Sequence, residues 1–258
     1  MRAKFFIFQI FCLTAFCLFS QNKTNELNIG IGYSQYKHTY AMPSGAGGAH
    51  YSLDFRHAHK LKSNSSVLFG YFAETDFSNF DTYKNFDYLF YGNGLNAGAF
   101  WLINFLKNEK INFYAGGGLF FDANIYYSYD SNTLSSGQGQ WFLSPNIYVA
   151  GDYSLKKFLF QFRFSMPLLS AGFQSRTLFY STFGENLKLV LTPNTFTFFT
   201  QRFYPQAAIS ASYPIFQTRK GECRLQAKYA FNALIQNRYP SEKKVINALH
   251  LGVVWMLK

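Results

Sequence analysis

The chain has 258 residues and a formal net charge of +11, with 14% charged and 21% aromatic residues. So much aromatic content with so little charge excludes an intrinsically disordered chain. After residue 20 no stretch reaches the about 18 uninterrupted apolar residues that a membrane-spanning helix needs, so a bundle of such helices is excluded too.

The first twenty residues have the features of a secretory signal peptide. Arg2 and Lys4 precede an apolar run over residues 5–19, which ends at the small residue Ser20. A positive start, an apolar centre of this length and a small residue near the cleavage point are the three parts of such a signal.

We therefore predict that residues 1–20 are removed on export and that residues 21–258 form one domain. Attachment of a lipid at Cys17 would need a small residue before the cysteine, and Phe16 is not small. The remaining domain keeps only Cys223, so no internal disulfide is expected, and Cys223 is interpreted as an apolar wall residue.

Beyond residue 20 the hydrophobic pattern has a period of two residues. The longest example is 111–130, where the odd positions are apolar or small and most even positions are polar or small. A helix would mix these two sets, and a strand of this length is typical of a membrane crossing rather than of a soluble sheet. In chain order, alternating segments lie at 27–34, 51–56, 67–74, 95–103, 111–130, 143–153, 158–165, 206–213, 224–232 and 248–257.

The connections between these segments alternate in length. The short ones are 60–65, 107–110, 155–157 and 217–222, and the long ones are 41–48, 78–90, 131–140 and 174–194, with a short exception at 238–243. Short periplasmic turns and longer external loops give this rhythm. We therefore predict an all-β fold, an antiparallel up-and-down transmembrane β-barrel of about ten strands.

The segment 174–194 leaves two interpretations open. It could hold two further strands, which would give a barrel of twelve. Its run over 186–191 lacks clean alternation, and Pro193 is unsuited to a central wall strand. The alternative is an external loop folded over the mouth that serves recognition or gating.

This pattern resembles that of the small outer-membrane β-barrel proteins of Gram-negative bacteria. The richness in Phe, Tyr, Asn and Lys and the start Ser20–Gln21–Asn22 resemble the Bacteroidota members. The C-terminal strand alternates from Leu249 to Leu257 as in these proteins, although the chain ends in Lys258 rather than in an aromatic residue. The resemblance implies an outer-membrane location, with outer-membrane lipids and the barrel-assembly machinery as partners.

Charged residues occupy the positions predicted to face the lumen. They are Asp54, Arg56, Glu74, Asp76, Asp122, Asp152, Arg163, Arg224 and Lys228. Charges in a narrow lumen are costly unless they are paired, so we predict a cross-strand network of salt bridges that fills it. A constriction that selects ions is the alternative.

Four of the five histidines lie in pairs whose spacing could suit a metal ion. If the first hairpin closes around 41–48, His38 and His50 face each other inside the mouth, but a third ligand is lacking, so we predict a mouth-lining pair and no metal. His57 and His59 share the outward face near the periplasmic end, where a girdle position is expected. No cofactor is predicted.

Basic residues gather in the short connections. They are Lys60, Lys62, Lys107, Lys110, Lys156, Lys157, Arg219 and Lys220. A basic rim of this kind attracts anionic phospholipid headgroups. Because these charges lie in turns rather than on a helix or a sheet face that could read bases, nucleic acid is not expected as a partner.

Motifs of known outer-membrane enzymes are missing. Omptin-type proteases use an Asp-x-His element, which does not occur in this sequence. A lipid hydrolase needs a serine and a histidine together on the outer surface, and no outward serine matches His57 or His59. We therefore expect a non-enzymatic protein with a structural, surface-binding or narrow-pore role and a ligand that the sequence does not identify. An outer-membrane hydrolase or protease and a secreted soluble β-sandwich binding module are the alternatives.

Overall fold

The structure, a computed structural model, describes residues 23–38, 42–60, 66–81, 88–130, 133–174, 195–198, 201–236 and 242–257. Within these ranges no helix is long and apolar enough to cross a bilayer. The strands are β1 (Lys23–His38), β2 (Met42–Lys60), β3 (Val67–Asp81), β4 (Tyr88–Lys107), β5 (Ile111–Asp130), β6 (Thr133–Leu155), β7 (Phe158–Pro167), β8 (Leu169–Gln174), β9 (Thr195–Phe198), β10 (Arg202–Phe203), β11 (Gln206–Thr218), β12 (Gly221–Gln236) and β13 (Glu242–Leu257). The predicted signal peptide at 1–20 and the predicted mouth-covering loop at 175–194 lie outside the described residues, so both stay predictions.

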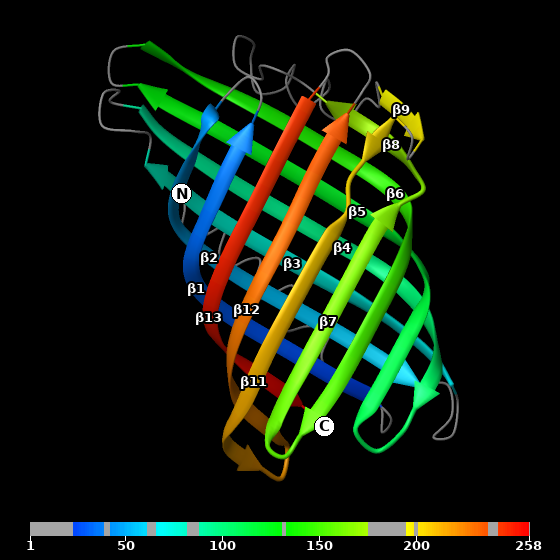
Figure 1. Ribbon diagram of the computed structural model, residues 1–258. Helices are drawn as coiled ribbons and strands as arrows, with labels where there is room; N and C mark the ends of the chain where they lie inside the picture. The colour runs from blue at the N-terminus through cyan, green and yellow to red at the C-terminus, as the bar shows by residue number, and fades with distance from the viewer. Residues whose placement is uncertain are drawn as a thin grey trace.

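These strands form a closed antiparallel barrel with ten wall positions (Figure 1). The first strand β1 pairs with the last strand β13, and this pairing closes the wall. Strands β7 and β8 both pair with β6 and together occupy one wall position, interrupted at Leu168. Strands β9, β10 and β11 together occupy the next position, since β10 and β11 both pair with β12.

The count of ten confirms the prediction and removes the twelve-stranded alternative. Strand β8 pairs directly with β9, with Leu169 opposite Phe198, so no additional strand lies between them. The strands could be counted from the sequence because each wall strand is long enough for its alternation of apolar and polar residues to be recognised by itself.

Three short turns mark one end of the barrel, which we call the turn end; the opposite end is the loop end. The turns lie at 108–110, 156–157 and 219–220. In the first turn, the Asn108 side-chain oxygen accepts hydrogen bonds from the backbone N–H groups of Lys110 and Ile111. In the second, Lys156 has a φ of 54°, the left-handed conformation that a tight hairpin requires. Strand β13 ends at this same end (Figure 1).

The outer face of the barrel is apolar. Side chains more than half exposed there include Ile29, Ile31, Leu119, Ile209, Ile215, Leu225, Leu249 and Leu251. In β5, Leu119 is exposed whereas Phe120 and Asn124 are buried, which confirms the predicted facing of this strand. An exposed apolar band of this kind is the lipid-facing surface of a membrane barrel.

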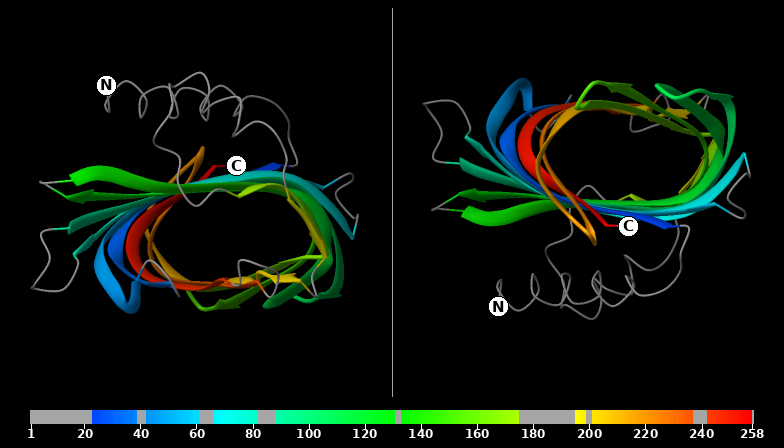
Figure 2. Two further views of the ribbon diagram at one scale, coloured as in Figure 1. Left: turned by 90° about the horizontal axis from the view of Figure 1, so that it is seen from above. Right: turned by 90° about the horizontal axis from the view of Figure 1, so that it is seen from below.

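Seen along its axis the barrel is oval (Figure 2). Side chains from opposite sides of the wall consequently reach one another across the lumen. Glu26 of β1 lies 2.7 Å from Arg163 of β7, and Asn96 of β4 donates a hydrogen bond to Gln206 of β11. The core of this protein is therefore the filled interior of its own barrel.

Candidate functional site

Aromatic side chains of β2–β6 fill the part of the lumen nearest the turn end. This aromatic plug consists of the rings of Phe72, Phe100, Tyr114, Phe120 and Tyr148, with Ala58 and Leu102 packed against them. The rings of Phe72 and Phe120 meet edge to face at 4.9 Å, and those of Phe100 and Tyr148 lie 5.4 Å apart. Gly98 makes room for them, since a Cβ at this position would lie 2.6 Å from the Phe120 ring.

Arg56 lies inside this plug and not in a salt bridge. Its guanidinium carbon is 5.4–5.6 Å from the ring centroids of Phe72, Phe100 and Tyr148. One guanidinium nitrogen donates a hydrogen bond to the Tyr148 hydroxyl at 2.5 Å. Among the described residues Arg56 forms no ion pair within 4 Å, so the predicted pairing of Arg56 with an acid is wrong. Cation–π contacts with the three rings stabilise this charge instead, while Arg56 Nε has no hydrogen-bond partner among the described residues.

A buried ion pair joins β2 and β12 near the middle of the lumen. Lys228 Nζ lies 2.7 Å from Asp54 Oδ2, and each side chain is about nine-tenths buried. The Asn28 amide donates hydrogen bonds to Asp54 and to Gln226. Two of the predicted network residues, Asp54 and Lys228, are thus brought together, with two amides that the sequence did not single out.

A second pair crosses the lumen closer to the turn end. Arg163 binds Glu26 at 2.7 Å, and Gln161 lies between Glu26 and Asp152. Glu26 is not among the predicted lumen charges because the first predicted alternating segment begins one residue later, at position 27. Its even position would have placed it with the inward set.

Arg224 forms a local contact rather than a bridge across the lumen. It pairs with Glu222 two residues earlier on the same strand, at 3.0 Å. It also donates hydrogen bonds to the Ser212 hydroxyl and to the Lys157 carbonyl. Arg224 thus connects β11, β12 and the 156–157 turn at the turn end of the barrel.

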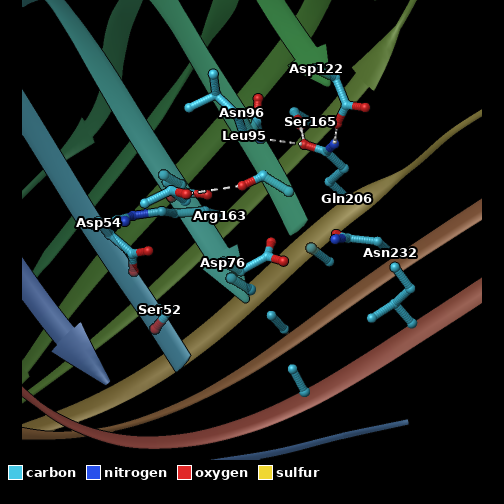
Figure 3. Close-up of a pocket in the computed structure, with 18 of the residues that line it drawn as sticks. Ser52, Asp54, Asp76, Leu95, Asn96, Asp122, Arg163, Ser165, Gln206 and Asn232 are labelled. Carbon is cyan, nitrogen blue, oxygen red and sulfur yellow. Dashed lines mark hydrogen bonds between the residues drawn. The ribbon is translucent and has the colours of Figure 1, made fainter. Parts of the chain in front are cut away.

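The three remaining predicted charges line a cavity of about 120 Å³ between the Asp54–Lys228 pair and the loop end (Figure 3). We call this cavity the chamber. Glu74 and Asp76 reach it from β3 and Asp122 from β5. Asp122 accepts hydrogen bonds from the Tyr204 hydroxyl and the Gln206 amide. Gln206 in turn accepts from Asn96 and from Ser165, which fixes one wall of the chamber.

Two histidines form the other wall. His50 of β2 and His250 of β13 meet edge to face with ring centroids 4.4 Å apart. Gly32 of β1 lies opposite both histidines in the sheet register, and a Cβ at this position would meet the backbone of Leu249 and His250. His50 Nδ1 is 2.7 Å from the hydroxyl of Ser78.

The predicted pairing of His38 with His50 is wrong in its register. The structure places Met42 opposite His38 and Gly32 opposite His50. The first hairpin is tighter than the sequence suggested, so β1 and β2 stay paired up to His38. The real partner, His250, is 200 positions further along the chain, and only the closure of β1 against β13 brings it near.

The outward histidines lie near the turn end. His57 Nδ1 is 2.7 Å from the Asn25 side-chain oxygen, and the His57 ring stacks on Tyr71 at 4.7 Å. Within the described part of the chain, no group of three or more His, Cys, Asp or Glu side chains is arranged to hold a metal ion. Cys223 is a free, partly buried thiol.

Comparison with known proteins identifies a fold and no family. No protein-family model and no curated protein matches the chain. The outer membrane protease OmpT of Escherichia coli is similar with a TM-score of 0.53 at 10% identity, over 93% of this chain and 99% of that one. Also similar are the β domain of the Bordetella autotransporter BrkA (TM-score 0.46, 8% identity, 92% of this chain and 100% of that one) and the Yersinia pestis attachment invasion locus protein Ail (0.39, 8%, 92% and 99%).

The likeness to OmpT shows that the chain has the fold of an outer-membrane β-barrel. At this identity it concerns the fold alone.

Proposed function

We propose that this protein is an integral outer-membrane barrel of the Bacteroidota type, non-enzymatic, whose lumen is closed and whose activity lies at its loop end. The observation that carries this proposal is the filling of the lumen: the aromatic plug occupies one side and the Asp54–Lys228 and Glu26–Arg163 pairs cross the rest. Next to these pairs a space of only about 20 Å³ remains, which is room for about one water.

The two ends of the barrel support its orientation in a membrane. The turn end carries exposed basic residues: Lys107, Lys110, Lys156, Lys157, Arg219 and Lys220. These fit the anionic phospholipid headgroups of a periplasmic leaflet. Outer-membrane lipids and the barrel-assembly machinery are accordingly its expected partners, and the loop end with its chamber faces the outside.

Two observations support a non-enzymatic role: a protease motif that is missing from the sequence and the hydrogen bonds of the chamber histidines. The Asp-x-His element expected of an omptin-type protease is missing from the chain. In the chamber the histidines use Nδ1 for serine hydroxyls that belong to the wall: Ser52 for His250 and Ser78 for His50. These contacts hold the rings in place, and no carboxylate of the described residues is hydrogen-bonded to either ring as the acid of a catalytic triad would be.

Conductance of the refolded full-length protein in a planar bilayer tests the closed lumen. We expect no steady channel current from the unchanged protein. The double variant Phe100→Ala/Tyr148→Ala, which opens the plug, should conduct, whereas Ile209→Ala on the outer face should behave like the unchanged protein. A steady current from the unchanged protein would show that the lumen is open and would favour narrow-pore transport.

A further inference from the structure

The chamber has a surplus of hydrogen-bond acceptors on one wall. Glu74, Asn96 and Asp122 stand side by side on β3, β4 and β5, in one row of the sheet register. Asp76 follows in the next row toward the loop end, above Gly94, where a Cβ would come within 2.5 Å of the Asp76 carboxylate. This glycine is therefore needed for Asp76 to lie across the wall.

The donors of this wall already bind protein acceptors. The Asn96 amide donates to Gln206, and the Gln206 amide and the Tyr204 hydroxyl donate to Asp122. The Asn96 side-chain oxygen, by contrast, is buried and has no hydrogen-bond partner among the described residues. Glu74 forms no hydrogen bond or ion pair with any described residue.

The bases that line the chamber are each engaged elsewhere. Lys228 binds Asp54, Arg163 binds Glu26, and Arg56 lies over the rings of the plug. Glu74 interacts with Arg163 and Lys228 only electrostatically, across a distance longer than an ion pair. The carboxylate of Glu74 is thus available to a cation that enters the chamber.

The opposite wall contributes two buried, partly unused side chains. His50 and His250 are 5% and 4% exposed and line the same chamber. Their Nδ1 atoms face Ser78 and Ser52, so the other edge of each ring is left for a ligand in the chamber. The buried side-chain oxygen of Asn96 has no partner among the described residues, which costs free energy that a ligand donating to it would recover.

From these observations we propose that the chamber binds a small organic cation with several N–H donors, an ammonium or a guanidinium compound. Glu74 and the side-chain oxygen of Asn96 would accept its hydrogen bonds, and the edges of His50 and His250 would close around it. The cavity of about 120 Å³ is about six times the space beside the ion pairs that holds one water, so it admits a small organic molecule. A bare metal ion fits less well because no three metal-ligating side chains in the described part of the chain converge.

Binding of radiolabelled putrescine and agmatine to the refolded full-length protein in detergent tests this proposal by equilibrium dialysis. Saturable binding is expected, with no competition from the neutral diol 1,4-butanediol. Glu74→Gln should weaken binding at least tenfold, and Glu74→Asp, which keeps the charge, should weaken it less. The matched control is Glu222→Gln, which removes a carboxylate at the turn end and should leave binding unchanged.

Absence of saturable binding, equal loss in Glu74→Gln and Glu222→Gln, or full competition by equimolar Mg²⁺ would each overturn the site. Each variant is first shown to be folded by its heat-dependent mobility on a gel. This proposal rests on the closed lumen, but the two can fail separately. A protein that conducts and still binds putrescine refutes only the closed lumen, and one that neither conducts nor binds refutes only the cation site.

Discussion

The lumen-facing sides of β2–β6 and of β11–β13 with β1 are built from different residues. The first side carries large rings, whose members are Phe72, Phe100, Phe120, Phe142 and Tyr148, and the second carries polar side chains, mainly Asn28, Ser210, Ser212, Gln226 and Lys228. Small barrels fill their interior by setting large residues against small ones. In this oval barrel one whole side of the wall carries the large residues and the other side the smaller ones. The rings of the first side therefore fill the part of the lumen that the smaller side chains of the second side do not reach.

The two sides should respond differently to substitution. Burial of rings stabilises the barrel in proportion to the apolar area removed from water. Loss of one ring therefore lowers the free energy of unfolding only by the contribution of that ring. A polar network stabilises only while each buried member keeps its partner, and removal of one partner leaves a charge buried alone. The following variants test this difference, beginning with the largest effect.

Lys228→Met should have the largest effect on stability. It leaves the Asp54 carboxylate, nine-tenths buried, with the Asn28 amide as its remaining hydrogen-bond donor. Removing one partner of a buried pair costs about 3–5 kcal/mol. Urea unfolding in lipid vesicles, followed by tryptophan emission, measures this loss. The double variant Asp54→Asn/Lys228→Met should regain most of it, and equal losses in the single and double variants would contradict the pair as the cause.

On the aromatic side, Phe120→Ala should cost about 3 kcal/mol, the lower end of the range for buried rings, because water from the chamber can enter the space. The Phe120 side chain is 3% exposed and contacts Phe72 and Tyr148. Phe120→Leu should recover more than half of this loss. If the alanine variant unfolds at the same urea concentration as the unchanged protein, the plug does not stabilise the barrel.

Leu119→Arg tests the neighbouring position on the opposite face of the same strand. Leu119 is 51% exposed on the outer wall, so an arginine there would face lipid. Near the bilayer midplane this costs about 2–4 kcal/mol, and in detergent the penalty should shrink. The ratio of the two losses, in vesicles and in micelles, checks the facing, and an equal loss in both media would contradict it.

The strand count and the facing of β5 could be predicted because the period-two pattern is local. Leu119 is at an odd position and Phe120 at an even one, so the alternation alone assigns them to opposite faces of the strand. The lengths of the connections predict which end of the barrel carries the short turns. The pairing of His50 with His250 could not be predicted in this way. It depends on which strands close the barrel and on their stagger, which is a property of the whole wall.

The contacts across the lumen were missed for the same reason. The sequence predicts that the Arg56 side chain faces the lumen. Whether such an arginine contacts an acid or a ring depends on which residues lie at the same level of the barrel axis on the opposite wall. The sequence places Tyr148 on β6, and the oval cross-section brings it to Arg56. The polar partners Asn28 and Gln226 carry no charge, so no charge count could reveal them.

Glu222→Gln should have the smallest effect, about 0.5 kcal/mol. Glu222 is one-quarter exposed at the turn end, where water screens its pair with Arg224, and exposed pairs contribute at most about 1 kcal/mol. Arg224 is itself buried, but it keeps its hydrogen bonds to the Ser212 hydroxyl and the Lys157 carbonyl, and a glutamine at position 222 still offers its guanidinium an oxygen that accepts. The same urea titration compares this variant with Lys228→Met. If the contribution of a polar pair to stability depends on how deeply it is buried, the losses of unfolding free energy in the two variants should differ at least fivefold. A loss above about 2 kcal/mol for Glu222→Gln would show instead that the polar network is coupled, so that removal of any member weakens all of it.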